Sequence, residues 1–178
     1  YFENYDIDES RWYNDVKDVN GRKYKGKIDL LVGGSPCQSF SMVGKRKGFE
    51  DTRGTLFYDF ARLINDAQPK CFIFENVKGL KSHDKGRTWK RIIEVLSSKD
   101  QLNYDIHPMV LNARDYGIPQ NRERVFIVGF KDKNPKFTKP EKIKLNSTMQ
   151  DFLQDNIDSK YFLPEKGIDF VTKDKNIQ

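Results

Sequence analysis

The sequence predicts an α/β fold with a mainly parallel sheet, and two features of its apolar pattern indicate that class. Residues 29–32 (DLLV) and 71–75 (CFIFE) form short, almost wholly apolar runs, as is typical of strands buried on both faces. Between them, residues 55–67 carry apolar side chains along one face of a helix. Strands that alternate with helices are typical of α/β sheets, in which ligands bind beyond the carboxyl ends of the strands.

The remaining elements follow from the same patterns. Residues 88–97 place Trp, Ile and Leu side chains on one stripe and predict a second amphipathic helix. Residues 104–111 and 124–130 (RVFIVGF) are further strand candidates. From about residue 131 the chain is basic and punctuated by proline, which is typical of a connector, and only residues 149–153 there favour a short helix.

Composition narrows the class of protein. The net charge of +6, from 32 Lys and Arg against 26 Asp and Glu, favours a polyanionic partner such as nucleic acid. Two cysteines in 178 residues exclude a disulfide framework and favour a reducing, cytoplasmic compartment. The two histidines lie in different segments with no cysteine pair at metal spacing, so no metal site is expected. No apolar run approaches the roughly 18 residues that span a bilayer, so no membrane partner is expected either.

The two cysteines have different surroundings. Cys37 lies in the stretch GGSPCQSFSMVG, a loop that follows the first apolar run, whereas Cys71 lies inside the second. Free cysteines are more often buried and inert than reactive, so Cys37 alone does not establish any chemistry. Its place at the rim where Glu75 closes the next strand makes it a candidate nucleophile, and Cys71 is read as strand core.

Three motifs decide between these interpretations when they are taken together. They are a Pro-Cys-Gln triplet at 36–38, a Glu-Asn-Val triplet at 75–77 and a Gln-x-Arg-x-Arg pattern at 120–124, with GFEDTRGTLF at 48–57 in the first gap. In this order they resemble the cytosine-C5 DNA methyltransferases, over about residues 14–130. The resemblance implies a Rossmann-like, S-adenosylmethionine-dependent methyltransferase sheet that is incomplete at its N-terminus.

The resemblance implies four catalytic residues. Cys37 would attack C6 of cytosine as a thiolate, with its pKa lowered by its position at a strand end and by nearby arginines. Glu75 would bind N3 and the 4-amino group, and its role as an acid calls for burial of its carboxyl group. Arg124 would hold O2 of the base, and Arg122 would orient Glu75 and the base through its guanidinium group.

The target base lies inside a duplex, so it must be flipped out before it can react. The partner implied is therefore double-stranded DNA, in a restriction-modification setting, and the loop from residue 38 to 53 would cover the base. Within that loop, Gln38 and Ser41 would contact the backbone or the gap, while Lys45 and Arg53 would contact phosphates. Where some relatives have a second serine, this chain has Val43.

The implied methyl donor is S-adenosylmethionine. Asp15 would bind the adenine amino group, and Val16, Pro36 and Leu56 would complete the retained part of the pocket. The Gly-rich loop after the family's first strand and the acidic residue after its second are not found. We expect these parts, and a C-terminal segment, to come from a longer chain or from a second subunit.

Domain boundaries and alternatives follow. Residues 1–135 are predicted to be part of the catalytic domain. Residues 136–178 are predicted to be a connector that contains the start of a target-recognition region. Three alternatives stay open at this point: an inactive DNA-binding remnant, one subunit of a split methyltransferase, and a tRNA cytosine-C5 methyltransferase.

Overall fold

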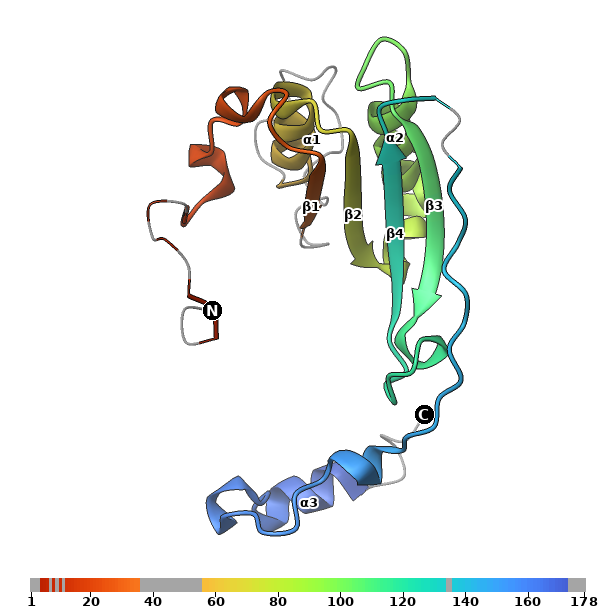
Figure 1. Cartoon of the computed structure of the whole chain (residues 1–178). Coiled ribbons are helices and arrows are strands. Elements are labelled where there is room, and N and C mark those ends of the chain that lie inside the picture. The colour runs from red at the N-terminus through yellow and green to blue at the C-terminus, as the bar shows by residue number, and fades with distance from the viewer. Residues whose placement is uncertain are drawn as a thin grey trace. The chain divides into compact units, whose positions relative to one another are not determined.

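The fold is described from a computed structural model that covers residues 4–6, 8, 10, 12–35, 56–133 and 136–172. The chain divides into two compact units, Tyr1–Leu145 and Asn146–Gln178. The first unit contains a sheet with two helices, and the second contains short helical segments (Figure 1). No helix in the described ranges is long and apolar enough to cross a bilayer.

Four strands form the sheet, in the order β1-β2-β4-β3. They are β1 (Leu30–Gly34), β2 (Cys71–Val77), β3 (Asp105–Asn112) and β4 (Glu123–Phe130). β1 runs parallel to β2, whereas β4 is antiparallel to both β2 and β3. The predicted strands are therefore present, and three of the four described strands, β1, β2 and β3, run in one direction while β4 runs against them. β3 returns into β4 through a short loop with no α-helix, and such a connection joins antiparallel neighbours.

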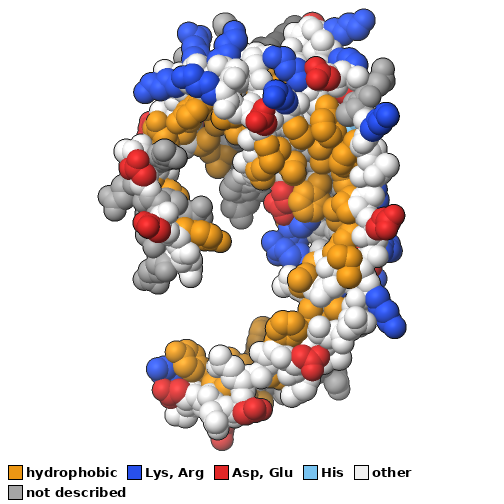
Figure 2. All heavy atoms as spheres, in the orientation of Figure 1, with side chains coloured by type: hydrophobic (Ala, Val, Ile, Leu, Met, Phe, Trp, Pro, Cys, Tyr) orange, Lys and Arg blue, Asp and Glu red, His pale blue; other side chains and the backbone are white. Residues whose placement is uncertain are grey.

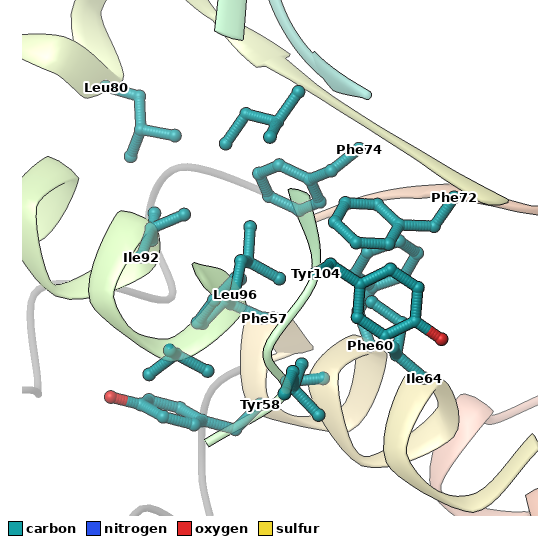
Figure 3. Close-up of a cluster of buried hydrophobic side chains, with 14 of the residues drawn as sticks. Phe57, Tyr58, Phe60, Ile64, Phe72, Phe74, Leu80, Ile92, Leu96 and Tyr104 are labelled. Atoms are coloured by element: carbon teal, nitrogen blue, oxygen red, sulfur yellow. The ribbon is translucent and has the colours of Figure 1, made fainter. Parts of the chain in front are cut away.

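Two helices cover one face of the sheet (Figure 1). They are α1 (Leu56–Ala67) and α2 (Arg87–Ser97), close to the predicted bounds. Their apolar stripes meet alternate side chains of the central strands, as the period-two alternation of a strand requires. In Figure 3 the rings of Phe72 and Tyr104 lie together in this core, with centroids 5.2 Å apart.

The opposite face of the sheet carries apolar side chains that no described helix covers. Val32 is 62% exposed and Leu30 is 50% exposed. Figure 2 shows hydrophobic side chains gathered over the strands on this face. Part of it is hollowed into a cavity of about 650 Å³ whose lining includes Leu30, Ile73 and Phe137.

Residues 136–145, here called the strap, follow β4 and belong to the first unit. Near one end, the ring of Phe137 packs against His107 and Phe130, with centroids 5.1 and 5.5 Å away. Near the other end, the Ile143 N–H donates to the Asp115 carbonyl over 2.9 Å, and Lys142 Nζ lies 3.0 Å from the Asp115 carboxylate. The strap is therefore attached to the sheet at one end and to the β3–β4 loop at the other.

The second unit contains a helix that the sequence pattern did not predict. The expected short helix is present as the 3₁₀ helix Met149–Phe152, which a Thr148–Asp151 capping box begins. α3 (Glu165–Thr172) was missed, because its eight residues present only a short apolar pattern. Its apolar side chains, including Ile168 and Phe170, are exposed.

Candidate active site

The carboxyl ends of β1 and β2 meet at one edge of the sheet. Gly34 pairs with Glu75 in the parallel register, and a Cβ at Gly34 would lie 2.8 Å from the Glu75 carbonyl oxygen. Only glycine permits that approach, because real Cβ atoms do not come so close to a backbone atom. One residue further along each strand, the Asn76 amide nitrogen donates to the Ser35 carbonyl over 2.7 Å. This bond fixes the point from which the chain enters the Pro-Cys-Gln loop.

Asn76 is a residue to which the sequence analysis gave no role of its own. Its side chain is 3% exposed, and its Oδ1 also accepts from the Val77 N–H over 2.8 Å. A buried amide that is hydrogen-bonded through both its nitrogen and its oxygen specifies one arrangement of the groups around it. The signal in the sequence was a second polar residue, directly after Glu75, near the end of an otherwise apolar strand.

Glu75 and Arg124 form an ion pair at the same edge. Arg124 Nε lies 3.0 Å from Glu75 Oε1, and the two side chains project from neighbouring strands β2 and β4. The Glu75 side chain is 39% exposed and that of Arg124 is 22% exposed. The expected burial of the Glu75 carboxyl group is therefore wrong, and an arginine at hydrogen-bond distance holds this carboxylate instead.

A cavity of about 260 Å³ opens beside this ion pair. Its charged lining residues are Glu75, Arg122 and Arg124, so three of the predicted catalytic residues come together. Its other lining residues are Leu111, Asn112, Ala113, Tyr116 and Phe126. A mostly apolar hollow with a few convergent charged groups is the usual form of a small-molecule or base-binding site.

A second ion pair, between Lys78 and Glu123, holds the amino end of β4. Lys78 Nζ lies 2.9 and 2.7 Å from the two carboxylate oxygens of Glu123, the residue between Arg122 and Arg124. Both side chains are largely exposed, so this pair contributes at most about 1 kcal/mol. Its effect is to align the start of β4 with the end of β2.

Three of the predicted cofactor residues, Asp15, Val16 and Leu56, lie in the described ranges. Asp15 is exposed, and its Oδ1 accepts from the Lys17 N–H over 2.9 Å, capping the 3₁₀ helix Val16–Asp18. Arg62 of α1 donates to the Val16 carbonyl over 3.0 Å and to the Val19 carbonyl over 2.9 Å. Leu56 begins the same helix, six residues earlier and thus about 9 Å along its axis.

Arg62 was also missed by the sequence analysis. It connects a helix to a segment more than forty residues away, and nothing local in the sequence indicates such a bond. Asp59 Oδ1 accepts from Arg62 Nε over 3.4 Å, and Asp66 Oδ2 lies 3.7 Å from the guanidinium group. These carboxylates hold the guanidinium group in the orientation that reaches both carbonyls.

Residues 1–177 match the family described as C-5 cytosine-specific DNA methylase. The chain belongs to that family. The resemblance inferred from the three motifs is thus confirmed. The described sheet and helices are one part of a Rossmann-like α/β fold, and the predicted fold class is confirmed.

Curated relatives of this chain include two bacterial methyltransferases. Type II methyltransferase M1.ScrFI of Lactococcus lactis subsp. cremoris is 47% identical over 142 residues, which are 78% of this chain and 36% of the relative. Type II methyltransferase M.HpaII of Haemophilus parainfluenzae is 48% identical over 153 residues, 84% of this chain and 42% of the relative. The chain therefore spans about two fifths of the length of these relatives.

Solved structures agree on the fold. The S. pombe Dnmt2 methyltransferase superposes with a TM-score of 0.63 at 16% identity, over 89% of this chain and 51% of that chain. At this identity the likeness shows the fold alone.

Several predicted site residues fall outside the described ranges. They are Pro36, Cys37, Gln38, Ser41, Lys45 and Arg53. Cys71, the rejected nucleophile, is described: it lies half-buried in β2, and burial raises the pKa of its thiol. A raised pKa lowers the thiolate fraction at neutral pH, which agrees with a structural role for Cys71. In the described part of the chain, no group of His, Cys, Asp and Glu is arranged to hold a metal ion.

Proposed function

We propose that the complete protein is a DNA (cytosine-5-)-methyltransferase of a restriction-modification system, acting on double-stranded DNA. The observation that carries the proposal is the Glu75–Arg124 ion pair beside a cavity, at the strand edge from which the Pro-Cys-Gln loop departs. Membership of the C-5 cytosine-specific DNA methylase family supports the reaction, and the Type II names of the relatives support the setting. A reducing cytoplasm is the compartment that suits a thiolate nucleophile and a DNA substrate.

In this proposal Cys37 supplies the nucleophile. Covalent geometry keeps its Cα within about 7.6 Å of the Cα of Ser35, which the Asn76 amide anchors. The thiolate adds to C6 of the flipped-out cytosine, forming an S–C bond and moving electron density to C5 and N3. After C5 has gained a methyl group, it loses its proton to a base, and the thiolate leaves as the double bond re-forms.

Glu75, Arg122 and Arg124 hold the base during this addition. Glu75 binds N3 and the 4-amino group, and a proton held at N3 stabilises the adduct. Arg124 shares its guanidinium group between Glu75 and O2 of the base, which fixes the plane of the ring. Arg122 lines the same cavity and orients Glu75 and the base from its rim.

The loop from residue 38 to 53 would enclose the flipped base. Gln38 and Ser41 would contact the DNA backbone and the gap left in the duplex. Lys45 and Arg53 would neutralise phosphates, which adds affinity without reading sequence.

S-adenosylmethionine, when bound, supplies an electrophilic methyl group. The described residues fit its adenine end, because Asp15 is exposed with carboxylate acceptor capacity for an amine and Val16 and Leu56 offer apolar contacts. The guanidinium group of Arg62 keeps Val16 in place by donating a hydrogen bond to the Val16 carbonyl. Pro36 would complete this wall, and the remaining contacts would come from segments outside this sequence.

Trapping of the covalent adduct tests the proposal. DNA with 5-fluorocytosine at the target position should form a stable adduct with the full-length protein, because fluorine at C5 cannot leave as a proton does. Mass spectrometry should find the adduct on Cys37. Cys37→Ser should abolish methyl transfer and trapping while DNA binding is kept, and Cys71→Ser should trap normally. An adduct on Cys71, or turnover by Cys37→Ser, would contradict the mechanism.

Substrate class is tested in the same assay. Double-stranded DNA should be methylated and should not be displaced by a tRNA competitor at equal concentration. Preferential methylation of the tRNA would instead favour the tRNA methyltransferase alternative.

A further inference from the structure

The loop between β3 and β4 connects the cavity wall to the two predicted catalytic arginines. It runs from residue 113 to 122, through the 3₁₀ helix Ala113–Asp115, and delivers Arg122 to the rim of the cavity. Arg122 is exposed, and no side-chain hydrogen bond of its own is found among the described residues. Its placement therefore depends on how its backbone is held.

Asn112 holds that backbone at both ends of the loop. It is the last residue of β3 and is 9% exposed. Its Oδ1 accepts from the Arg122 N–H over 3.0 Å and from the Arg114 N–H over 3.3 Å, and its Nδ2 donates to Asn121 Oδ1 over 2.7 Å. One buried amide thus bonds to the start and the end of the same loop.

Other bonds hold the loop less directly. The Arg122 N–H is shared with the Gln120 carbonyl at 3.0 Å, and the Arg122 carbonyl accepts from the Ala113 N–H over 3.1 Å. The first bond lies within the loop and sets its local shape, whereas the second joins the two loop ends next to the Asn112–Glu123 pair of the β3–β4 ladder. Asn112 is at the end of a strand, so its side chain transfers the rigidity of the sheet to the loop.

We propose that Asn112 is a positioning residue that sets the place of Arg122 in the base-binding cavity. The inference rests on the proposed role of Arg122 and adds a residue to which no role was assigned. Asn112 lines the cavity next to Arg122, but here it acts through its bonds to the Arg122 and Arg114 amides. Loss of those bonds lets the guanidinium group of Arg122 leave the geometry in which it orients Glu75 and the base.

A double-mutant cycle in the full-length protein tests this. Asn112→Ala should lower kcat for DNA methylation about 10-fold to 100-fold and change the KM for S-adenosylmethionine less than about twofold. The double variant with Arg122→Ala should be no slower than Arg122→Ala alone, because the first change acts through the second residue. Independent, multiplying effects of the two changes would overturn the proposal.

Two further variants separate positioning from loss of stability. Asn121→Ala, at an exposed position, removes only the bond to Asn112 Nδ2 and should lower kcat about threefold. Tyr104→Phe removes one buried hydrogen bond, from Tyr104 Oη to the Pro69 carbonyl at 2.7 Å, and should lower Tm while kcat stays within twofold. If Tyr104→Phe lowered kcat as much as Asn112→Ala at equal loss of Tm, Asn112 would be structural only.

Hydrogen exchange gives a readout that does not depend on activity. The Arg114 and Arg122 amides should be protected in the wild-type protein and should exchange at least tenfold faster in Asn112→Ala, with the central amides of β4 unchanged. Unchanged exchange at both amides overturns the positioning role even if the enzyme is active. An inactive wild-type protein in which these amides depend on Asn112 would instead refute the proposed function.

Discussion

Replacement of Asn76 by Asp tests the hydrogen bond that joins the carboxyl ends of β1 and β2, because it replaces only the amide NH2 group with an oxygen. In Asn76→Asp, a carboxylate oxygen takes the place of the amide nitrogen that lies 2.7 Å from the Ser35 carbonyl oxygen. One hydrogen bond is lost, at about 1 kcal/mol, and a buried carbonyl is left without its donor, at about 1–3 kcal/mol. Because Asn76 is only 3% exposed, the new charge also loses hydration. The expected decrease in the free energy of unfolding at pH 8 is about 3–5 kcal/mol.

The pH dependence of this decrease has a definite sign. A protonated carboxyl group can donate to the Ser35 carbonyl, so folding favours the neutral form and raises the pKa of the introduced group above its unfolded value near 3.9. The folded state then binds more protons than the unfolded state between the two pKa values, and stability falls as pH rises through this window. Urea denaturation at pH 5 and pH 8 should therefore show a smaller deficit at pH 5.

A matched variant controls for the added charge. Asn65→Asp changes an exposed asparagine of α1 and should alter the free energy of unfolding by less than about 1 kcal/mol at either pH. A deficit for Asn76→Asp below 1 kcal/mol at pH 8, or one that is equal at the two pH values, would refute the reasoning.

Three other predictions concern separate parts of the protein. Arg53→Ala should weaken DNA binding and reduce the slope of log affinity against log salt by about one, with the methylated sequence unchanged, as filter binding and methylation mapping would show; a changed target sequence at constant salt slope would make Arg53 a base reader. Arg62→Met removes two charge-assisted hydrogen bonds to backbone carbonyls and should lower the free energy of unfolding by about 1–3 kcal/mol. Calorimetry should show an affinity for S-adenosylmethionine that is about tenfold lower, and unchanged affinity would mean that the Val16 segment does not contact the cofactor. Burial raises the pKa of Tyr104 to about 12, so between pH 10 and 12 this hydroxyl stays protonated in the folded state while it ionises in the unfolded state. The free energy of unfolding of the wild type should therefore fall by roughly 2–3 kcal/mol more than that of Tyr104→Phe over this range, and parallel urea titrations that show no difference would refute this.

Much of the fold could be predicted because each strand and helix has a local apolar pattern. The run CFIFE and the stripe along α1 gave both elements to within two residues. The reversed direction of β4 was not predicted, although the sequence holds the reason. The segment between the last two strand candidates is about a dozen residues long and has no helical pattern, and a parallel crossover usually contains a helix.

In the candidate site, too, the residues that belong to local motifs could be predicted and the contacts between distant segments could not. The three charged residues of the cavity could be predicted, because motifs name residue types at fixed spacing and the strand order brings Glu75 and Arg124 together. The exposure of Glu75 could not, since it depends on which groups cover the strand end. Asn112 and Arg62 act through bonds to backbone amides and carbonyls of other segments, and a backbone partner leaves no trace in the sequence.

The strap has a consequence for how such enzymes can be recombined. Chimeras that exchange the C-terminal half between relatives need a junction, and residue 135, the predicted end of the catalytic part, is the natural choice from sequence. A junction there would pair the Lys142 and Ile143 of one parent with the Asp115 loop of the other, and it would divide the Phe137–His107 ring contact in the same way. A junction after Leu145, where the first compact unit ends, keeps every one of these pairs within a single parent.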